Sequence, residues 1–446
     1  MVTSPLLPTL FGAGRRPVDM NPACSPRRIV CSILLWGALA GWGTAFAADG
    51  HDHGKAAAQG KSTGPVRELT LPEGLGSAQS ITMDPAGRIW FSEKVGKKLA
   101  MYDPEKKEFA GYSLPASWGN MGFSQITAGP DGVLWFTVNR WAEGTEEPHM
   151  LGSFSPADGH FTKFAVPNKA IPQELMVDGK GVIWFFAANK NHLYRIDPRT
   201  FSLKGYPIPT ANGHPRSLAA ARDGHIWFVE ANTNKIGEFI PEREEFREYD
   251  VLTAFSNPGK LSIDKQGRIW FVQVTANRIG VFSPDRNRFD EVIVPTSGSA
   301  PVALANDDNG NVWFLEYKGN KVGVFNPESA VFREYDIPTY GSLPAEMVLD
   351  RGRSMLWFTQ TATDAKRLGM ISIGEALASS GKQDASSSGM QTEQQSNEGS
   401  VRWPIILAIL IAFLILGGWR ARSVLKRRQS QRGESERHCV TSGRLN

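Results

Sequence analysis

The fold is decided by four short runs of sequence: Pro215-Arg216-Ser217-Leu218, Ile226-Trp227-Phe228-Val229-Glu230, Asn234-Lys235-Ile236-Gly237 and Phe246-Arg247-Glu248-Tyr249. Each run is short and rich in aliphatic or aromatic residues, and turn-forming residues such as Arg222-Asp223-Gly224 separate the runs. None of them has the 3.6-residue spacing of an amphipathic helix. The stretch therefore predicts four short β-strands joined by tight turns.

The same unit recurs along the middle of the chain. An aliphatic residue followed by Trp-Phe occurs seven times, at spacings of 45, 49, 43, 43, 43 and 44 residues. A fixed period in the forties is typical of repeat proteins. One four-stranded unit cannot bury both of its faces, whereas seven units in a ring bury them against one another. The sequence predicts an all-β, seven-bladed β-propeller whose Trp and Phe side chains fill the space between the four-stranded antiparallel blades. The tryptophans are Trp90, Trp135, Trp184, Trp227, Trp270, Trp313 and Trp357.

The two ends of the repeat region predict how the ring closes. The seventh unit runs through Leu368-Gly369-Met370-Ile371 and then passes into Ser/Gly/Gln-rich sequence without a fourth strand. Residues 66–72, Val-Arg-Glu-Leu-Thr-Leu-Pro, resemble the fourth strands of other units. We therefore expect the N-terminal strand to complete the last blade, so that residues 65–378 form one closed propeller.

Residues 1–47 have the features of a secretory signal. Arg27 and Arg28 precede an apolar run that ends in Ala45-Phe46-Ala47, the small-x-small pattern of a cleavage site. Met20 is an alternative start, and twin-arginine export is an alternative to general secretion. Residues 48–64 are then interpreted as a linker.

Residues 403–419 predict a transmembrane helix after a flexible linker at 379–402. The stretch from Trp403 to Trp419 is uninterrupted and apolar, close to the ~20 residues that span a bilayer. The basic tail, 420–446, follows at once, and the positive-inside rule places such a tail in the cytoplasm. We expect a single-pass protein of the cell membrane, with the propeller periplasmic or extracellular. A buried helix is the alternative, although this stretch has no polar face.

The charge distribution argues against nucleic acid as a partner. The formal net charge of the 446 residues is +4, but the excess of Lys and Arg lies in the two terminal segments, and the body is mildly acidic. The three cysteines, Cys24, Cys31 and Cys439, are also terminal. The body therefore has neither a disulfide framework nor a cysteine-ligated metal site.

The repeat unit resembles the virginiamycin B lyase (streptogramin lyase) family of seven-bladed propellers. The resemblance rests on Pro-x-x-aliphatic, Asp-x-x-Gly, aliphatic-Trp-Phe-x-Glu, Asn-Lys-Ile-Gly and Glu-Tyr-x-aliphatic-Pro, and covers roughly residues 65–375. It implies elimination chemistry that opens the lactone of cyclic depsipeptide antibiotics with a divalent metal such as Mg²⁺. It also implies catalytic histidines directly after the repeat Pro and glutamates in Trp-Phe-x-Glu.

This chain departs from the family pattern at the histidines. The residues after the repeat Pro, or after its replacement, include no histidine: they are Gln79, Ser124, Gln173, Arg216, Gly259, Val302 and Ala345. The glutamate position keeps a carboxylate in three of the seven units: it reads Glu93, Val138, Ala187, Glu230, Gln273, Glu316 and Gln360.

The candidate site residues lie where two strands share one rim. The start of the innermost strand and the end of the second strand are side by side in a hairpin, so we expect both to reach the mouth of the channel. The candidate catalytic residues are Glu230 and His214, and the candidate ligand-binding residues are Arg216, Glu93, Glu316, Gln273 and Gln360. We expect Arg216 to lie beside Glu230 and to hold it ionised, which favours ligand binding over proton abstraction.

A longer loop in the second unit is a candidate metal site. Residues 139–149 contain three carboxylates and one imidazole, ligands that suit a divalent cation: Glu143, Glu146, Glu147 and His149. An ordinary solvated acidic loop is the alternative.

Two functions remain open from the sequence. The first is a binding module that presents its rim to a small molecule, a partner protein or a cell-envelope polymer. The second is a metal-dependent lyase that opens a depsipeptide lactone and so gives antibiotic resistance. Carboxylates that bind a metal at the rim favour the lyase, whereas a rim with no metal favours the binding module.

Overall fold

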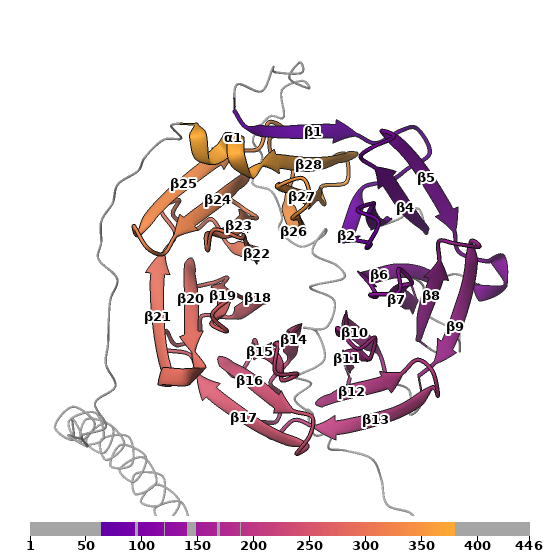
Figure 1. The fold of residues 1–446 in the computed structure, drawn as a ribbon, viewed down its shortest axis with the longest axis horizontal. Coiled ribbons are helices and arrows are strands. Elements are labelled where there is room, and N and C mark those ends of the chain that lie inside the picture. The colour runs from indigo at the N-terminus through magenta and orange to yellow at the C-terminus, as the bar shows by residue number, and fades with distance from the viewer. Residues whose placement is uncertain are drawn as a thin grey trace, which may run out of the picture. The chain divides into compact units, whose positions relative to one another are not determined.

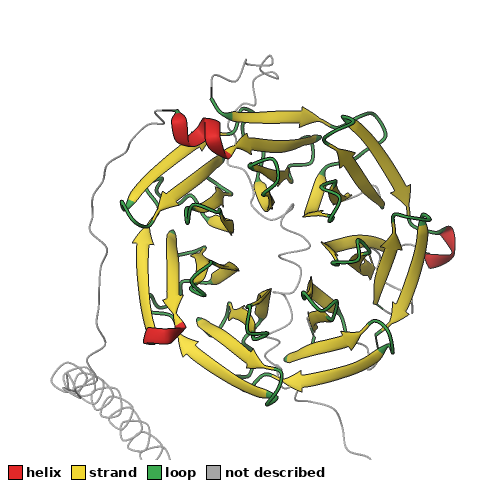
Figure 2. Ribbon diagram, in the orientation of Figure 1, coloured by secondary structure: helices red, strands yellow, loops and turns green. Residues whose placement is uncertain are grey.

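Seven four-stranded antiparallel sheets form the blades of a ring in the computed structural model, which describes residues 64–93, 97–119, 121–140, 149–166, 170–187 and 189–379 (Figure 1). Within each blade the strands pair in order from the centre of the ring outward. The predicted seven-bladed propeller is thus confirmed. Figure 2 shows that strands make up nearly all of the regular structure.

The strands of the first four blades are, from the centre outward, β2 (Ala78–Met83), β3 (Ile89–Glu93), β4 (Lys98–Asp103) and β5 (Glu108–Ser113); β6 (Met121–Ala128), β7 (Leu134–Arg140), β8 (Met150–Ser155) and β9 (His160–Ala165); β10 (Pro172–Val177), β11 (Ile183–Ala187), β12 (His192–Asp197) and β13 (Ser202–Pro207); β14 (Pro215–Ala220), β15 (Ile226–Glu230), β16 (Lys235–Ile240) and β17 (Glu245–Asp250).

The strands of the last three blades are β18 (Pro258–Ile263), β19 (Ile269–Gln273), β20 (Arg278–Ser283) and β21 (Arg288–Ile293); β22 (Pro301–Asn306), β23 (Val312–Glu316), β24 (Lys321–Asn326) and β25 (Val331–Asp336); β26 (Pro344–Asp350), β27 (Met355–Gln360), β28 (Arg367–Ser372) and β1 (Val66–Thr70). Short 3-10 helices lie at η1 (Ala116–Trp118) and η3 (Pro284–Arg286), and β28 leads into α1 (Ile373–Ala378).

The Trp-Phe pairs hold neighbouring blades together, as predicted. Successive side chains of a strand point to opposite faces of the sheet. Trp227 accordingly packs with Phe271 and other residues of the fifth blade, while Phe228 packs with Trp184 of the third. Gly237 lies over the Phe228 ring, where an added Cβ would be 2.2 Å from a ring carbon. The glycine of Asn-Lys-Ile-Gly is therefore required by this close approach.

The Asn of the same motif fixes the loop between blades. Asn234 Nδ2 donates hydrogen bonds to the carbonyls of Val251, at 3.1 Å, and Thr253, at 3.0 Å. Its Oδ1 accepts from Ser256. Asn277 and Asn320 repeat these contacts in the next two blades.

The N-terminal strand closes the ring, as predicted. β1 pairs antiparallel with β28, from Val66 opposite Ile371 to Thr70 opposite Arg367. Glu68 accepts hydrogen bonds from the backbone N–H of Thr339, at 3.1 Å, and from its hydroxyl, at 2.9 Å. The same Thr-to-Glu contact joins blades elsewhere, as between Thr296 and Glu334. The seam of the ring is therefore built like its other blade junctions.

α1 was not predicted from the sequence, because six residues are too few to show a helical period. It begins in the seventh blade and packs against the sixth, where Tyr335 donates to the carbonyl of Ala376. The described part of the chain therefore includes a short α-helix that the sequence pattern did not predict.

No helix in the described part of the chain is long and apolar enough to cross a membrane. The predicted signal, 1–47, and transmembrane segment, 403–419, lie outside the described residues, as do most of both predicted linkers and the whole basic tail.

Candidate functional site

The candidate residues gather on the side of the ring where first strands begin and second strands end, which we call the rim face. Pro215 is paired with Glu230, and Pro301 with Glu316. Ala78 is paired with Glu93 in the same register. The start of each first strand thus lies beside the end of the second strand, as predicted.

The three glutamates on this face are buried instead of lining an open rim. Glu93 is 1% exposed, and Glu230 and Glu316 are 0% exposed. The loop that enters the fourth blade covers Glu230, and an added Cβ at Gly213 would be 2.4 Å from its Oε2. The carboxylates that were expected to reach the mouth of the channel are therefore covered, because the loops between blades fold over the ends of the second strands.

Burial also changes the protonation of these glutamates. Burial, reinforced by nearby Glu248, raises the pKa of Glu230 to about 7, although Thr233 donates to it at 2.6 Å. Burial and nearby Glu334 raise the pKa of Glu316 to about 8. Burial also raises the pKa of Glu93, although the N–H of Gly76 donates a hydrogen bond at 3.0 Å that acts in the opposite direction.

The expected pairing of Arg216 with Glu230 is wrong. Arg216 is opposite Val229 in the register, and its Nη2 lies 3.2 Å from His214 Nδ1. A guanidinium can only donate, so His214 Nδ1 accepts and the imidazole is neutral. Burial and then Arg216 lower the pKa of His214, with Glu174 opposing them. Arg216 thus interacts with His214 and Glu174. The cation opposite Glu230 is Lys235 of β16, which lowers the pKa of Glu230 by less than burial raises it.

Two glutamines occupy the glutamate position in alternate blades. Gln273 and Gln360 are both 0% exposed. Gln360 Nε2 donates to Glu68 Oε1 at 2.9 Å. At Gln360 an amide therefore serves as the neutral donor to the glutamate of the fourth strand, whereas the amide of Gln273 has no hydrogen-bond partner among the described residues. A protonated Glu230 or Glu316 can serve the same purpose as Gln360 beside Glu248 or Glu334.

A set of polar side chains at the centre of the ring was not predicted from the sequence. Each first strand has a bulge near its start, seen as a shift in register with the second strand. In every blade but the sixth, the residue two places after the repeat Pro, or after its replacement, lies in this bulge. Ser80 there bonds to Glu346 of the neighbouring blade, and four further residues make contacts across the ring: Gln125, Glu174, Lys260 and Glu346. Charged residues in an otherwise apolar inner strand were the signal that could have identified them.

The predicted metal loop cannot be placed, because Glu143, Glu146 and Glu147 lie outside the described residues. His149 directly precedes β8. Among the described residues, no group of three or more His, Cys, Asp or Glu side chains could hold a metal ion. The rim residues do not fit the Mg²⁺ that the family resemblance implies, since the glutamates are buried with raised pKa values and no histidine follows the repeat Pro.

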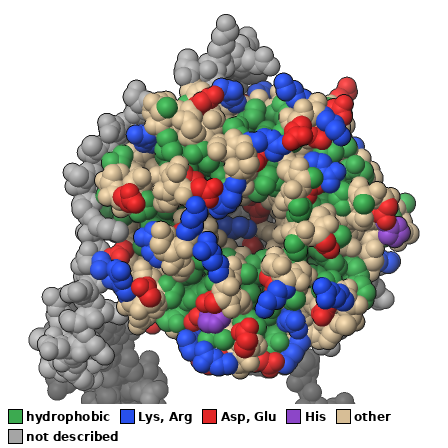
Figure 3. Space-filling view, in the orientation of Figure 1, with side chains coloured by type: hydrophobic (Ala, Val, Ile, Leu, Met, Phe, Trp, Pro, Cys, Tyr) green, Lys and Arg blue, Asp and Glu red, His purple; other side chains and the backbone are tan. Residues whose placement is uncertain are grey.

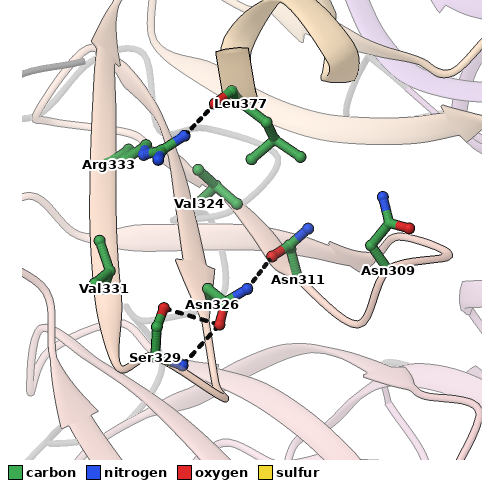
Figure 4. A pocket seen from close by; sticks show the side chains of 8 residues that line it. All are labelled: Asn309, Asn311, Val324, Asn326, Ser329, Val331, Arg333 and Leu377. Atoms are coloured by element: carbon green, nitrogen blue, oxygen red, sulfur yellow. Dashed lines mark hydrogen bonds between the residues drawn. The ribbon is translucent and has the colours of Figure 1, made fainter. Parts of the chain in front are cut away.

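A cavity of about 370 Å³ lies away from these residues, between the sixth blade and α1 (Figure 4). Asn326 donates to Asn311, and Ser329 donates to Asn326. Arg333 donates to the carbonyl of Leu377. Much of the polar lining is therefore hydrogen-bonded to other lining residues. None of the sequence-predicted site residues lines this cavity.

The fold and the rim together define a closed seven-bladed propeller with polar groups gathered at one mouth of the ring. This chain belongs to the virginiamycin B lyase family, whose model matches residues 64–368. No protein with curated function matches the chain.

Three solved structures are similar in fold. A streptogramin B lyase is 21% identical, with a TM-score of 0.60, covering 68% of this chain and 96% of its own. A catalytically inactive virginiamycin B lyase from Staphylococcus aureus with quinupristin is 23% identical, with a TM-score of 0.60 and coverages of 69% and 98%. Ycf48 bound to D1 peptide is 13% identical, with a TM-score of 0.55 and coverages of 69% and 95%. At these identities the likeness concerns the fold alone.

Proposed function

We propose that this protein is a binding propeller that takes a small molecule or a partner protein at the rim around Arg216 and His214, and that it does not act as a streptogramin lyase. The observation that carries the proposal is the absence of histidine at every position after the repeat Pro. The burial of Glu93, Glu230 and Glu316 supports it, because a general base must come within hydrogen-bond reach of its substrate.

A metal-dependent lyase is the second candidate. One observation favours it besides family membership: the pKa of Glu230 is raised to about 7, where a general base is most effective at neutral pH. In that case Glu230 would be the base, His214 would assist, and Glu143, Glu146, Glu147 and His149 would be the candidates to hold the metal.

We expect purified full-length protein with Mg²⁺ to open a streptogramin B lactone no faster than buffer does. Ring opening is followed by mass spectrometry, with an active family lyase as the positive control. Metal-dependent opening that is lost in Glu230→Gln and kept in Glu108→Gln, which changes an exposed glutamate of β5, would replace the binding module with the lyase.

We further propose that residues 403–419 tether the propeller to the membrane, with residues 48–402 outside the cytoplasm. The apolar stretch and the basic tail that follows it support this topology. Protease added to spheroplasts is expected to digest the propeller and to spare an epitope at Asn446. A propeller that is protected until the membrane is lysed would contradict this topology.

A further inference from the structure

The contacts between inner strands cross the centre of the ring, which we call the central channel. Lys260 of β18 lies 3.6 Å from the carboxylate of Glu174 in β10 and 3.8 Å from that of Glu346 in β26. Gln125 of β6 donates to Glu346 at 2.8 Å. These strands belong to blades that are not neighbours, so their side chains meet in the channel and not within a blade junction. In the view of Figure 3 the ring is hollowed at its centre, and Lys and Arg side chains border the hollow.

The charges alternate in sign along this set of residues. Glu174 interacts with both Arg216 and Lys260, and Lys260 also interacts with Glu346. Burial alone would lower the pKa of Lys260, but Glu174 and Glu346 outweigh it and raise the pKa. The side chains of Lys260, Glu174 and Glu346 are 33%, 23% and 21% exposed, so solvent reaches all three of them.

The two carboxylates, Glu346 and Glu174, differ in their surroundings. Glu346 accepts hydrogen bonds from Ser80 Oγ, at 2.8 Å, from Ile81 N–H, at 3.3 Å, and from Gln125. Glu174 has a left-handed backbone, with φ of 40°, inside the bulge of β10. Strained non-glycine residues of this kind are kept where the surrounding structure over-determines them, and they cluster at functional sites.

The two cations retain capacity to donate. Arg216 Nε is buried and has no hydrogen-bond partner among the described residues. Both Lys260 separations exceed the length of a direct hydrogen bond, so neither carboxylate fills an ammonium donor directly. Glu174 is the common neighbour of both cations, which brings their donors to the same part of the channel. A water molecule or an oxygen acceptor of a ligand can fill such donors.

We propose that Arg216 and Lys260 bind the carboxylate of a ligand that enters the central channel from the rim face. This inference rests on the proposed binding function and names its ligand class. Two carboxylates already lie in the channel, so a monocarboxylate leaves less repulsion than a dianion such as phosphate. A peptide C-terminus and a small organic acid share this chemistry.

The test is calorimetric titration of the full-length protein with N-acetyl-alanyl-alanine, its C-terminal amide, propionate and inorganic phosphate. The peptide acid, propionate or both are expected to bind, and the amide and phosphate are not. Binding of the acid peptide alone identifies a peptide C-terminus, and equal binding of propionate identifies a small acid.

Variants separate a binding site from a structural brace. Lys260→Met and Arg216→Met should each weaken carboxylate binding at least tenfold, while Lys265→Met, at an exposed ion pair of the same blade, should leave it unchanged. Glu174→Gln should strengthen binding several-fold by removing a repelling charge, a gain that a structural role does not produce and that remains measurable if Lys260→Met fails to fold.

Two outcomes overturn the inference. If acid and amide bind equally, the carboxylate class is wrong while binding at the rim stands. If no probe binds the folded protein at a concentration of about 20 mM, the carboxylate site is absent. The proposed rim function is then judged only by the lactone assay.

Discussion

A chain that begins at Gly74 is expected to lose most of its cooperative folding, whereas a chain that begins at Ser62 is expected to melt like the full-length protein. The truncation removes β1, whose five residues pair with β28 and whose Val66 is fully buried. It also removes Leu71, which is 4% exposed in the core beside Trp357.

The expected loss is large compared with the stability of a domain. Burying one Val or Leu side chain is worth about 1.5–3 kcal/mol, and a net hydrogen bond about 1 kcal/mol. Two such side chains and the pairing of a five-residue strand together contribute about 5 kcal/mol or more, against a typical domain stability of about 5–15 kcal/mol. The exposed edge of β28 would in addition favour aggregation.

Thermal unfolding monitored by near-UV circular dichroism measures this effect, because the Trp-Phe core gives the signal. Glu68→Ala in the full-length chain isolates one part of it, since Glu68 accepts from Thr339, Gln360 and Arg367 across the seam. Glu73→Ala, an exposed residue just after β1, is the matched control. Equal melting temperatures for the chains that start at Gly74 and Ser62 would mean that another contact closes the ring.

The sequence predicted the fold because its determinants are local and repeated. Trp227 and Phe228 must point to opposite faces of one strand, so the pair alone specifies that both faces are buried. The register between Pro215 and Glu230 followed from the hairpin in the same way. Seven repeats of nearly equal length then predicted a ring, because in a closed ring every blade is covered on both faces.

The site was predicted less well because its geometry depends on a bulge and a loop. The bulges of β10 and β18 turn the residue two places after Pro toward the channel, so Glu174 and Lys260 meet there, whereas the sequence pattern pointed to Arg216, one place after its Pro. The loop over Gly213 buries Glu230, which the strand pattern places at a rim. Neither feature has a period that a sequence pattern reveals.

Replacing Glu230 or Glu316 with Gln is expected to stabilise the protein at pH 8. The unfolded carboxyl titrates near 4.5, whereas burial raises the folded pKa to about 7 for Glu230 and to about 8 for Glu316. Between these values the native state binds more protons than the unfolded state, so stability falls as pH rises through this window. Each glutamate therefore destabilises the protein at pH 8 by on the order of 2 kcal/mol, allowing for relaxation around the charge.

Two positions equivalent to Glu230 and Glu316 already have Gln in this chain. Gln273 and Gln360 are fully buried there, and Gln360 donates to Glu68 as a protonated Glu230 would donate to Glu248. The Gln side chain at 230 can also keep an oxygen to accept from Thr233. Chemical unfolding of wild type, E230Q and E316Q from pH 4 to pH 9 measures the effect, with E108Q at an exposed position as the control.

The free energies of unfolding of wild type and variant are expected to coincide near pH 4, where the carboxyl is protonated in both the folded and the unfolded protein. They then separate, and the difference becomes constant above pH 7 for E230Q and above pH 8 for E316Q. A gap that is independent of pH would mean that the gain comes from packing and not from protonation. If E230Q instead lowers stability only above pH 5, then Glu230 is ionised in the folded protein, and Lys235, which is paired with it across the β15–β16 hairpin, is the cation that holds it so.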